Sequence, residues 1–212
     1  FVNNNIIKYF AEPRIILNRV KRAENLKNLV PIIKFQKKYF YLYQMINGNV
    51  LYDQENKFLI SDLLKWLNNE LWIKKKLSLN QKKKFFEACH DFYYKKTLNR
   101  LKEYYLRFNI EDQETCIDNI KIPKVKEILG LINFDWLSGG IPSNFHGDLQ
   151  FDNILITPEK KFKLLDWRQD FSGLIDYGDM YYDLAKLNGG LYISYKKIKQ
   201  NKFKFNLDNK KV

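Results

Sequence analysis

The chain has 212 residues, of which 37 are Lys or Arg and 24 are Asp or Glu, so its formal net charge is +13. Hydrophobic residues make up 45% of the sequence and aromatic residues 16%, which excludes a disordered polycation without a core. The positive charge is either a footprint for the phosphates of nucleic acid or nucleotide, or a lysine-rich exposed surface.

The cysteine and histidine content excludes two further classes of protein. Cys89 and Cys116 are too few for a disulfide framework, and His90 and His146 do not form a zinc-binding pattern with them. No apolar run approaches the roughly 20 residues needed to span a bilayer. We therefore expect a cytoplasmic protein without a membrane span.

The first fifty residues predict a strand, a helix and a hairpin. Residues 5–10 are rich in β-formers, Pro13 is well placed to open a helix, and apolar residues then recur at helical spacing over 14–29. The strands of the hairpin are predicted at 30–35 and 39–46, and Asn47-Gly48-Asn49 ends the second.

The remaining chain is predicted to be mainly helical, with one later hairpin. Helical spacing is found over three segments, and an aromatic stripe along the second of them predicts core packing; the segments are 58–71, 81–108 and 125–131. No helix or strand is predicted over residues 109–122. Two β-prone runs, 153–156 and 162–166, are separated by the turn 157–160.

The segment around this second hairpin carries the residues that suggest chemistry. Asp148 and Asn153 lie five apart on a loop, and Asp166 follows the second strand of the hairpin. Two carboxylates and a carboxamide converging on one space form an all-oxygen set, which suits Mg²⁺ better than zinc or copper. In phosphoryl transfer, Asp148 suits the base that accepts the hydroxyl proton, and Asn153 and Asp166 suit the metal.

Three motifs in order resemble those of one enzyme family. They are His146-Gly147-Asp148 with Asn153 five residues later, Leu165-Asp166-Trp167, and Gly178-Asp179 followed by Asp183-Leu184-Ala185. This pattern resembles the aminoglycoside phosphotransferase and choline kinase superfamily. The resemblance implies an α+β, protein-kinase-like two-lobed fold. Residues 1–47 would be a truncated small β lobe, and residues 48–212 a mostly helical large lobe with the catalytic and metal-binding loops.

The resemblance also implies a nucleotide site. Lys8 is similar to the kinase lysine that binds the ATP phosphates, and Glu24 to its ion-pair partner, although Arg19 and Glu12 leave other pairings open. Backbone groups of Gln44 and Ile46 would face adenine. Only seven residues precede Lys8 and none is glycine, so the family's glycine-rich phosphate loop is not part of this chain.

The implied activity is transfer of the γ-phosphoryl group of ATP to a hydroxyl of a sugar, amino alcohol or aminoglycoside-like acceptor. Asp148 would be the base, with Mg²⁺ held by Asn153 and Asp166. No dense acidic cluster lies outside the motifs, which favours a neutral or anionic acceptor. Arg168 and Asp170 either contact the acceptor or form an exposed loop pair.

Other residues of the motifs are expected to be structural. We expect His146 to brace the catalytic loop, Asp183 to bind the loop backbone from its helix, and Asp179 to cap that helix. The alternative function is a nucleic-acid-binding module, or a pseudokinase without phosphotransferase activity. Only 6 of the 37 basic residues are Arg, which disfavours nucleic acid as a partner.

Overall fold

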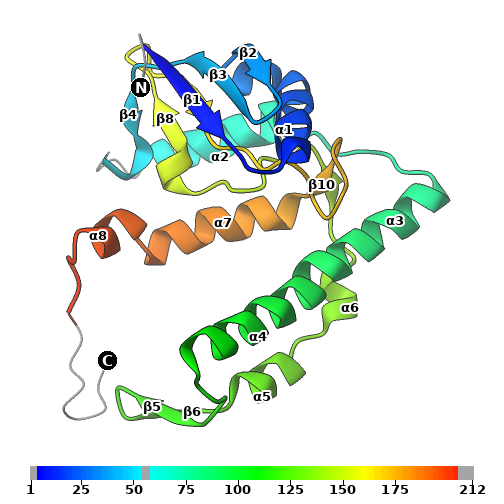
Figure 1. Ribbon diagram of the computed structural model, residues 1–212, viewed down its shortest axis with the longest axis vertical. Coiled ribbons are helices and arrows are strands. Elements are labelled where there is room, and N and C mark those ends of the chain that lie inside the picture. The colour runs from blue at the N-terminus through cyan, green and yellow to red at the C-terminus, as the bar shows by residue number, and fades with distance from the viewer. Residues whose placement is uncertain (1–3, 54–57, 205–212) are drawn as a thin grey trace.

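The computed structural model describes residues 4–53 and 58–204. The protein is of mixed α and β class: two three-stranded antiparallel sheets and two helices form one end, further helices and a two-stranded hairpin form the other, and helix α7 lies between them (Figure 1). The α-helices are α1 Pro13–Leu26, α2 Phe58–Glu70, α3 Leu79–His90, α4 Lys96–Phe108, α5 Val125–Gly130, α6 Phe134–Leu137, α7 Met180–Tyr192 and α8 Tyr195–Lys199. The strands are β1 Asn5–Tyr9, β2 Ile33–Lys37, β3 Phe40–Gln44, β4 Asn49–Val50, β5 Thr115–Ile117, β6 Ile120–Ile122, β7 Pro142–Ser143, β8 Ile154–Ile156, β9 Phe162–Leu164 and β10 Gly178–Asp179.

The N-terminal sheet has the strand order β1-β3-β2, and α1 connects β1 to β2. The predicted strand, helix and hairpin are confirmed within a few residues of their expected ends. Pro13 opens α1, where its missing N–H costs nothing because the first helical N–H groups have no partner within the helix. Lys8 pairs with Tyr41 in the β1–β3 register, so it lies near the end of an edge strand.

The second hairpin, β8–β9, lies beside β4 in a separate three-stranded sheet. Its second strand ends at Leu164 rather than at the predicted residue 166. The backbone of Asp166 has a φ of 56°, in the left-handed region, which is incompatible with a continued strand. This change of direction separates Asp166 from the strand and makes it part of the following loop.

The predicted long helix over 81–108 consists of α3, a π-helical turn at Asp91–Lys95, and α4. Ser78 and Gln81 form a capping box at its start, and Asn109 ends it in the left-handed conformation. The aromatic stripe is core in its first part, where Phe85 and Phe92 are buried. It is not core along α4, which buries no residue.

A hairpin, β5–β6, occupies part of the stretch for which no element was predicted. Asp118 and Asn119 form its two-residue turn, both with positive φ, as the tight turns that match strand twist require. The strands have only three residues each and leave most of their side chains exposed. They are therefore too short for an alternation of apolar and polar residues to identify them as strands.

Two hydrophobic clusters form the described core. The larger one joins α1 and β3 to α2, α7 and the β8–β9 hairpin, so it includes residues on both sides of position 47. Trp167 lies at its centre, fully buried, with its ring 5.9 Å from that of Tyr41. The smaller cluster packs Phe85 and Phe92 against Phe145 and Phe171.

Within the described ranges, no helix is both long enough and apolar enough to cross a membrane.

Candidate active site

Helix α7 holds the loop that carries Asp148 through hydrogen bonds to the loop backbone. The carboxylate of Asp183 accepts hydrogen bonds from the backbone N–H groups of His146 and Gly147, both at 2.7 Å, and from the indole of Trp72 at 3.3 Å. Burial raises the pKa of Asp183 to about 6, although these hydrogen bonds lower it. The predicted bracing role of Asp183 is confirmed.

Asp179 caps the N-terminus of α7, as predicted. Its carboxylate accepts hydrogen bonds from the N–H of Tyr181 at 3.1 Å, the N–H of Ile141 at 2.8 Å and the hydroxyl of Tyr93 at 2.6 Å. Burial raises its pKa, which these hydrogen bonds oppose. Asp179 and Asp183 together fix the helix that supports the loop.

His146 has the structural position that the sequence suggested. Its side chain is fully buried, and its Nδ1 accepts a hydrogen bond from the N–H of Asp148 at 3.3 Å. Its Nε2 has no partner among the described residues. Burial, together with the nearby charge of Arg22, lowers the pKa of His146 to about 4, so the ring is neutral at physiological pH.

Asp148 is surrounded by three polar side chains. Its Oδ1 lies 3.1 Å from Nζ of Lys186 and accepts a hydrogen bond from Nε2 of Gln150 at 2.9 Å, while Nδ2 of Asn153 lies 3.3 Å from Oδ2. Burial raises the pKa of Asp148, but the charge of Lys186 and the hydrogen bonds from Lys186 and Gln150 outweigh it, so the pKa is lowered. The carboxylate is therefore ionised at neutral pH.

Asn153 connects Asp148 to the loop that carries Asp166. Its Nδ2 also donates to the backbone oxygen of Asp148 at 2.8 Å, and its own backbone oxygen accepts from the N–H of Leu165 at 2.8 Å. Asp166 follows directly, with the left-handed φ already noted; such strained residues are common at functional sites. The structure thus brings the three predicted catalytic residues into one pair of bonded loops.

The donor chemistry at these loops fits a magnesium ion. Because the amide nitrogen of Asn153 is engaged by Asp148, its carbonyl oxygen is the end left to accept a cation, and Asp166 supplies carboxylate oxygens. Mg²⁺ is commonly held by one or two such groups together with substrate phosphates. Over the described part of the chain, no group of three or more His, Cys, Asp or Glu side chains is placed to hold a metal by itself.

Lys8 has a different partner from the one predicted. Its Nζ lies 2.5 Å from Oδ1 of Asp166, so the lysine reaches from β1 to the candidate metal-binding loop. Glu24 is exposed on α1, lines a surface cavity of about 600 Å³ between α1 and β2, and forms no ion pair within residues 4–53 and 58–204. On α1, the cationic side chain that acts electrostatically on Tyr41 is Arg19. The charge of Asp166 acts on the same tyrosine.

Gln44 and Ile46 lie apart from Asp148. They line a cavity of about 330 Å³ together with residues of the 28–34 segment, and the Gln44 side chain accepts a hydrogen bond from Nζ of Lys34 at 2.9 Å. A separate cleft of about 560 Å³ opens at the catalytic loop. This Asp148 cleft is lined by Asp148, Gln150, Asp152, Asn153, Tyr195, Lys196, Lys199 and Gln200.

Arg22 is a site residue that the sequence analysis missed. Its side chain is 2% exposed, and its guanidinium donates to the backbone oxygens of Phe145, His146 and Arg168. It also lies over the Phe145 ring, 3.8 Å from the centroid. Burial lowers its pKa to about 9, which still leaves it charged at neutral pH. Among the lysines and arginines of an amphipathic helix, nothing in the sequence marks this one as buried.

Lys186 and Gln150 are also additions from the structure. Lys186 lies three residues after Asp183 on α7, and residues at that spacing share a helix face. Once Asp183 was expected to contact the loop, the same spacing could have predicted that Lys186 lies beside it. Gln150 lies inside the loop motif and gave no separate signal.

No protein-family model matches this chain, and no curated protein matches it either.

Proposed function

We propose that the protein is an ATP-dependent small-molecule kinase of the aminoglycoside phosphotransferase and choline kinase type, which phosphorylates a hydroxyl of its acceptor. The observation that carries this proposal is the bonding of Asn153 to both loops: its side chain contacts Asp148, and its backbone pairs with Leu165, next to Asp166. A base, an amide oxygen and a second carboxylate at one place are what phosphoryl transfer requires.

The arrangement of the N-terminal segment supports a kinase-like fold. In kinases, the lysine that binds the nucleotide phosphates lies on a strand of the small lobe, and the helix that supports it follows. Here Lys8 lies on β1, α1 follows directly, and Lys8 reaches Asp166. The left-handed φ of Asp166 supports the same interpretation of its loop.

Asp148 receives the proton in this mechanism. The acceptor hydroxyl oxygen forms a bond to the γ-phosphorus, the bond between that phosphorus and the bridging oxygen of ATP breaks, and ADP leaves. The hydroxyl proton passes to the Asp148 carboxylate. Lys186 and Gln150 fix this carboxylate in its ionised form, so it can orient the hydroxyl before transfer.

Asn153 and Asp166 would hold Mg²⁺, which would supply positive charge to stabilise the phosphates during transfer. Lys8 lies against Asp166 and would contact the same phosphates. Arg22 and Asp183 act through the backbone: Arg22 binds carbonyl oxygens of both loops, and Asp183 binds N–H groups of the loop that carries Asp148.

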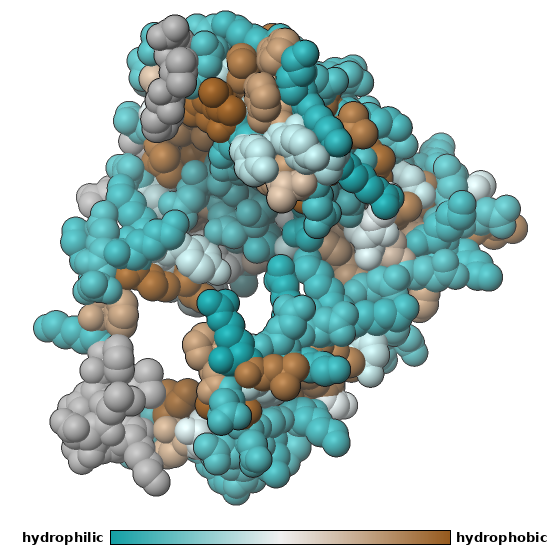
Figure 2. Space-filling model, viewed as in Figure 1, coloured by the Kyte–Doolittle hydropathy of each residue, from teal (hydrophilic) through white to brown (hydrophobic). Residues whose placement is uncertain are grey.

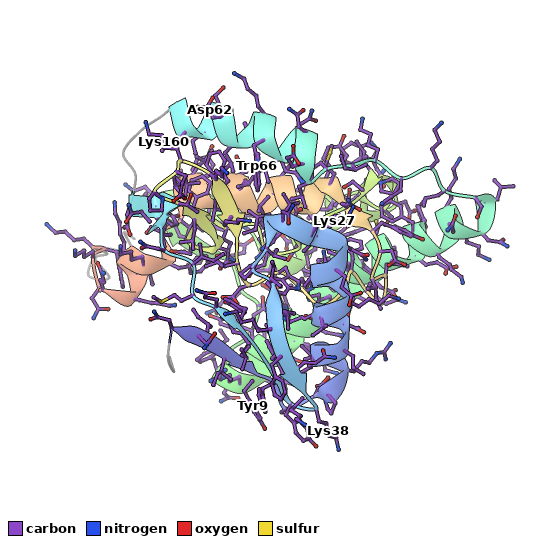
Figure 3. The ribbon with its side chains drawn as sticks, turned by 90° about the horizontal axis from the view of Figure 1, so that it is seen from above. Tyr9, Lys27, Lys38, Asp62, Trp66 and Lys160 are labelled. Atoms are coloured by element: carbon purple, nitrogen blue, oxygen red, sulfur yellow. The ribbon has the colours of Figure 1, made fainter. Side chains whose placement is uncertain are left out.

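The test is phosphoryl transfer from ATP with Mg²⁺ to a panel of sugars, sugar phosphates, amino alcohols and aminoglycosides. Asp148→Asn is expected to lower kcat by about 10²- to 10⁴-fold, the usual contribution of a general base, with the fold intact by circular dichroism. Asp62→Asn is the matched control, since Asp62 lies exposed on the outer face of α2 (Figure 3). Activity of Asp148→Asn near the wild-type rate would exclude this mechanism.

A further inference from the structure

Four basic side chains from three separate parts of the chain lie near one another, and two of them, Arg168 and Lys186, border the loop that carries Asp148. Lys96 and Arg100 come from the first turns of α4, Arg168 from the loop after Asp166, and Lys186 from α7. We call these four residues the basic cluster. Arg168, Arg100 and Lys186 all act electrostatically on Lys96, which places each of the three within range of Lys96.

An aromatic platform holds the basic cluster in position. Nζ of Lys96 lies 3.8 Å from the centroid of the Phe92 ring, and the guanidinium carbon of Arg168 lies 4.9 Å from it. Phe92 packs edge-on against Tyr182 at 4.6 Å, and Nζ of Lys186 lies 5.8 Å from the Tyr182 ring. Cations held over buried aromatic rings lose less entropy on binding a ligand than free surface lysines do.

The basic cluster is adjacent to the reacting carboxylate. Lys186 contacts Asp148 directly. Arg168 packs on Gly147, the residue before Asp148: a Cβ placed on Gly147 would lie 2.6 Å from the Cβ of Arg168. Gly147 also has a φ of +88°, so glycine is needed at this position on both counts.

The cluster carries more positive charge than its neighbours neutralise. In the part of the chain that the structure describes, Lys96, Arg100 and Arg168 form no ion pair, and Nε of Arg168 is buried without a hydrogen-bond partner. Burial, followed by the charges of Arg168, Arg100 and Lys186, lowers the pKa of Lys96 to about 7. Asp170 opposes this lowering, and its Oδ1 already accepts from the N–H of Gly173.

The molecule is hollowed between two of the helices that carry the cluster (Figure 1, Figure 2). Figure 2 shows the molecule hollowed between the end with the small sheets and the end with α4, and hydrophilic residues border much of this hollow. Figure 1 shows α7 and α4 on its opposite sides. The two helices that supply Lys186 and Lys96 therefore border a common space (Figure 1, Figure 2).

We propose that the basic cluster binds an anionic group of the acceptor, a phosphate or a carboxylate, so that the substrate is an anionic hydroxyl compound such as a sugar phosphate or a sugar acid. This inference rests on the proposed function, because it identifies the acceptor of the same site. Arg168 would make the main directional contact, since a guanidinium matches the geometry of a carboxylate or phosphate. Lys96 and Arg100 add charge, and Lys186 lies between the bound anion and Asp148.

The first experiment measures anion binding without nucleotide or acceptor. Inorganic phosphate is titrated into the full chain at constant ionic strength and followed by calorimetry. Saturable binding is expected, weakened about tenfold or more in Lys96→Gln and Arg168→Gln, because each removes a charge-assisted contact. Lys102→Gln, an exposed lysine on the same helix, is the matched control and should bind as the wild type does. Arg168→Lys, which keeps the charge, should recover part of the affinity and guards against misfolding as the explanation.

The second experiment compares matched acceptors: glycerol with glycerol 3-phosphate, a hexose with its 6-phosphate, and a hexose with its uronic acid. The anionic member of at least one pair is expected to have a kcat/KM about tenfold or more higher, and Arg168→Gln should remove this preference.

Absence of saturable phosphate binding, or equal binding by all variants, would overturn the anion site whether or not the chain is a kinase. A preference for the neutral member of every productive pair would overturn the acceptor class. Phosphate binding at the cluster without transfer to any acceptor would overturn the proposed function and, with it, the cluster's role in acceptor binding.

Discussion

His146 and Asp183 are buried ionisable residues on either side of one backbone segment, and burial favours the neutral form of both. The pKa of the histidine is lowered to about 4 and that of the carboxyl is raised to about 6. The two shifts act oppositely on stability. The contribution of His146 is complete above about pH 6.5 and is lost as the pH falls toward 4, whereas that of Asp183 is complete below about pH 4 and is lost as the pH rises through 6.

His146→Gln isolates the contribution of the histidine to the pH dependence of stability, because Asp183 titrates in both proteins. Between pH 7.5 and pH 5 the wild type should lose about 2 kcal/mol of unfolding free energy more than the variant does. Urea unfolding at the two pH values measures this difference. An identical pH dependence in wild type and His146→Gln would mean that His146 is not held neutral.

Lys8→Met tests the nucleotide side of the site. Under the proposed function, removal of the charge that lies against Asp166 should raise the KM for ATP about tenfold or more and lower kcat, since Lys8 would donate a charged hydrogen bond to phosphate. Lys38→Met is the control, because Lys38 lies at the outer tip of the β2–β3 hairpin (Figure 3). Steady-state kinetics at saturating acceptor separates the two parameters. An unchanged KM for ATP would remove Lys8 from the phosphate site.

At the scale of elements, helix α1 contacts both loops of the candidate site. Arg22 fixes three carbonyls of the loops on which Asp148 and Asp166 lie, and the backbone oxygen of Arg19 accepts from the indole of Trp167 at 2.8 Å. A single helix of the N-terminal segment therefore sets the relative position of the two loops.

Arg22→Met should destabilise the protein by about 2–4 kcal/mol, because it leaves buried carbonyl groups without a donor. Lys21→Met, an exposed position one residue earlier on the same helix, should change stability by less than about 0.5 kcal/mol. Chemical denaturation of both variants provides the comparison. Equal stability of the two variants would show that Arg22 does not hold the loops.

The positions of helices and strands could be predicted from the sequence where the apolar spacing was long or a motif was specific. The spacing over 14–29 predicted α1, and the motif around Asp183 predicted both its helix and its contact with the loop. The same patterns did not predict the partner of Lys8, since choosing between Glu24 and Asp166 requires the rotation of α1 and the path of a loop more than 140 residues away. Arg22 was missed because helical periodicity does not distinguish a buried arginine from an exposed one.

At the scale of the whole molecule, burial is uneven. The larger core cluster draws on segments from both ends of the chain, whereas α4 and α5 bury no residue and β5–β6 is mostly exposed. The basic cluster spans this boundary. Its members come from three distant segments, so the sequence showed an excess of lysine without showing where four cations meet.

Hydrogen exchange followed by mass spectrometry should reproduce this unevenness. Amides of 115–130 are expected to exchange about a hundredfold or more faster than those of α1 and β3, since few buried contacts oppose local opening there. Rates are compared after correction for intrinsic exchange of the same peptides when unfolded. Equal protection of the two regions would contradict this distribution of stability.

The π-helical turn at 91–95 determines which way the rest of the long helix faces. A π turn accommodates one residue more than an α-helical turn, and one residue corresponds to a rotation of about 100° around the helix axis. Deleting one residue there would straighten the helix and turn Lys96 and Arg100 away from Phe92, without changing any side chain of the basic cluster. The extra residue of the π turn therefore sets the direction in which these two members of the basic cluster point.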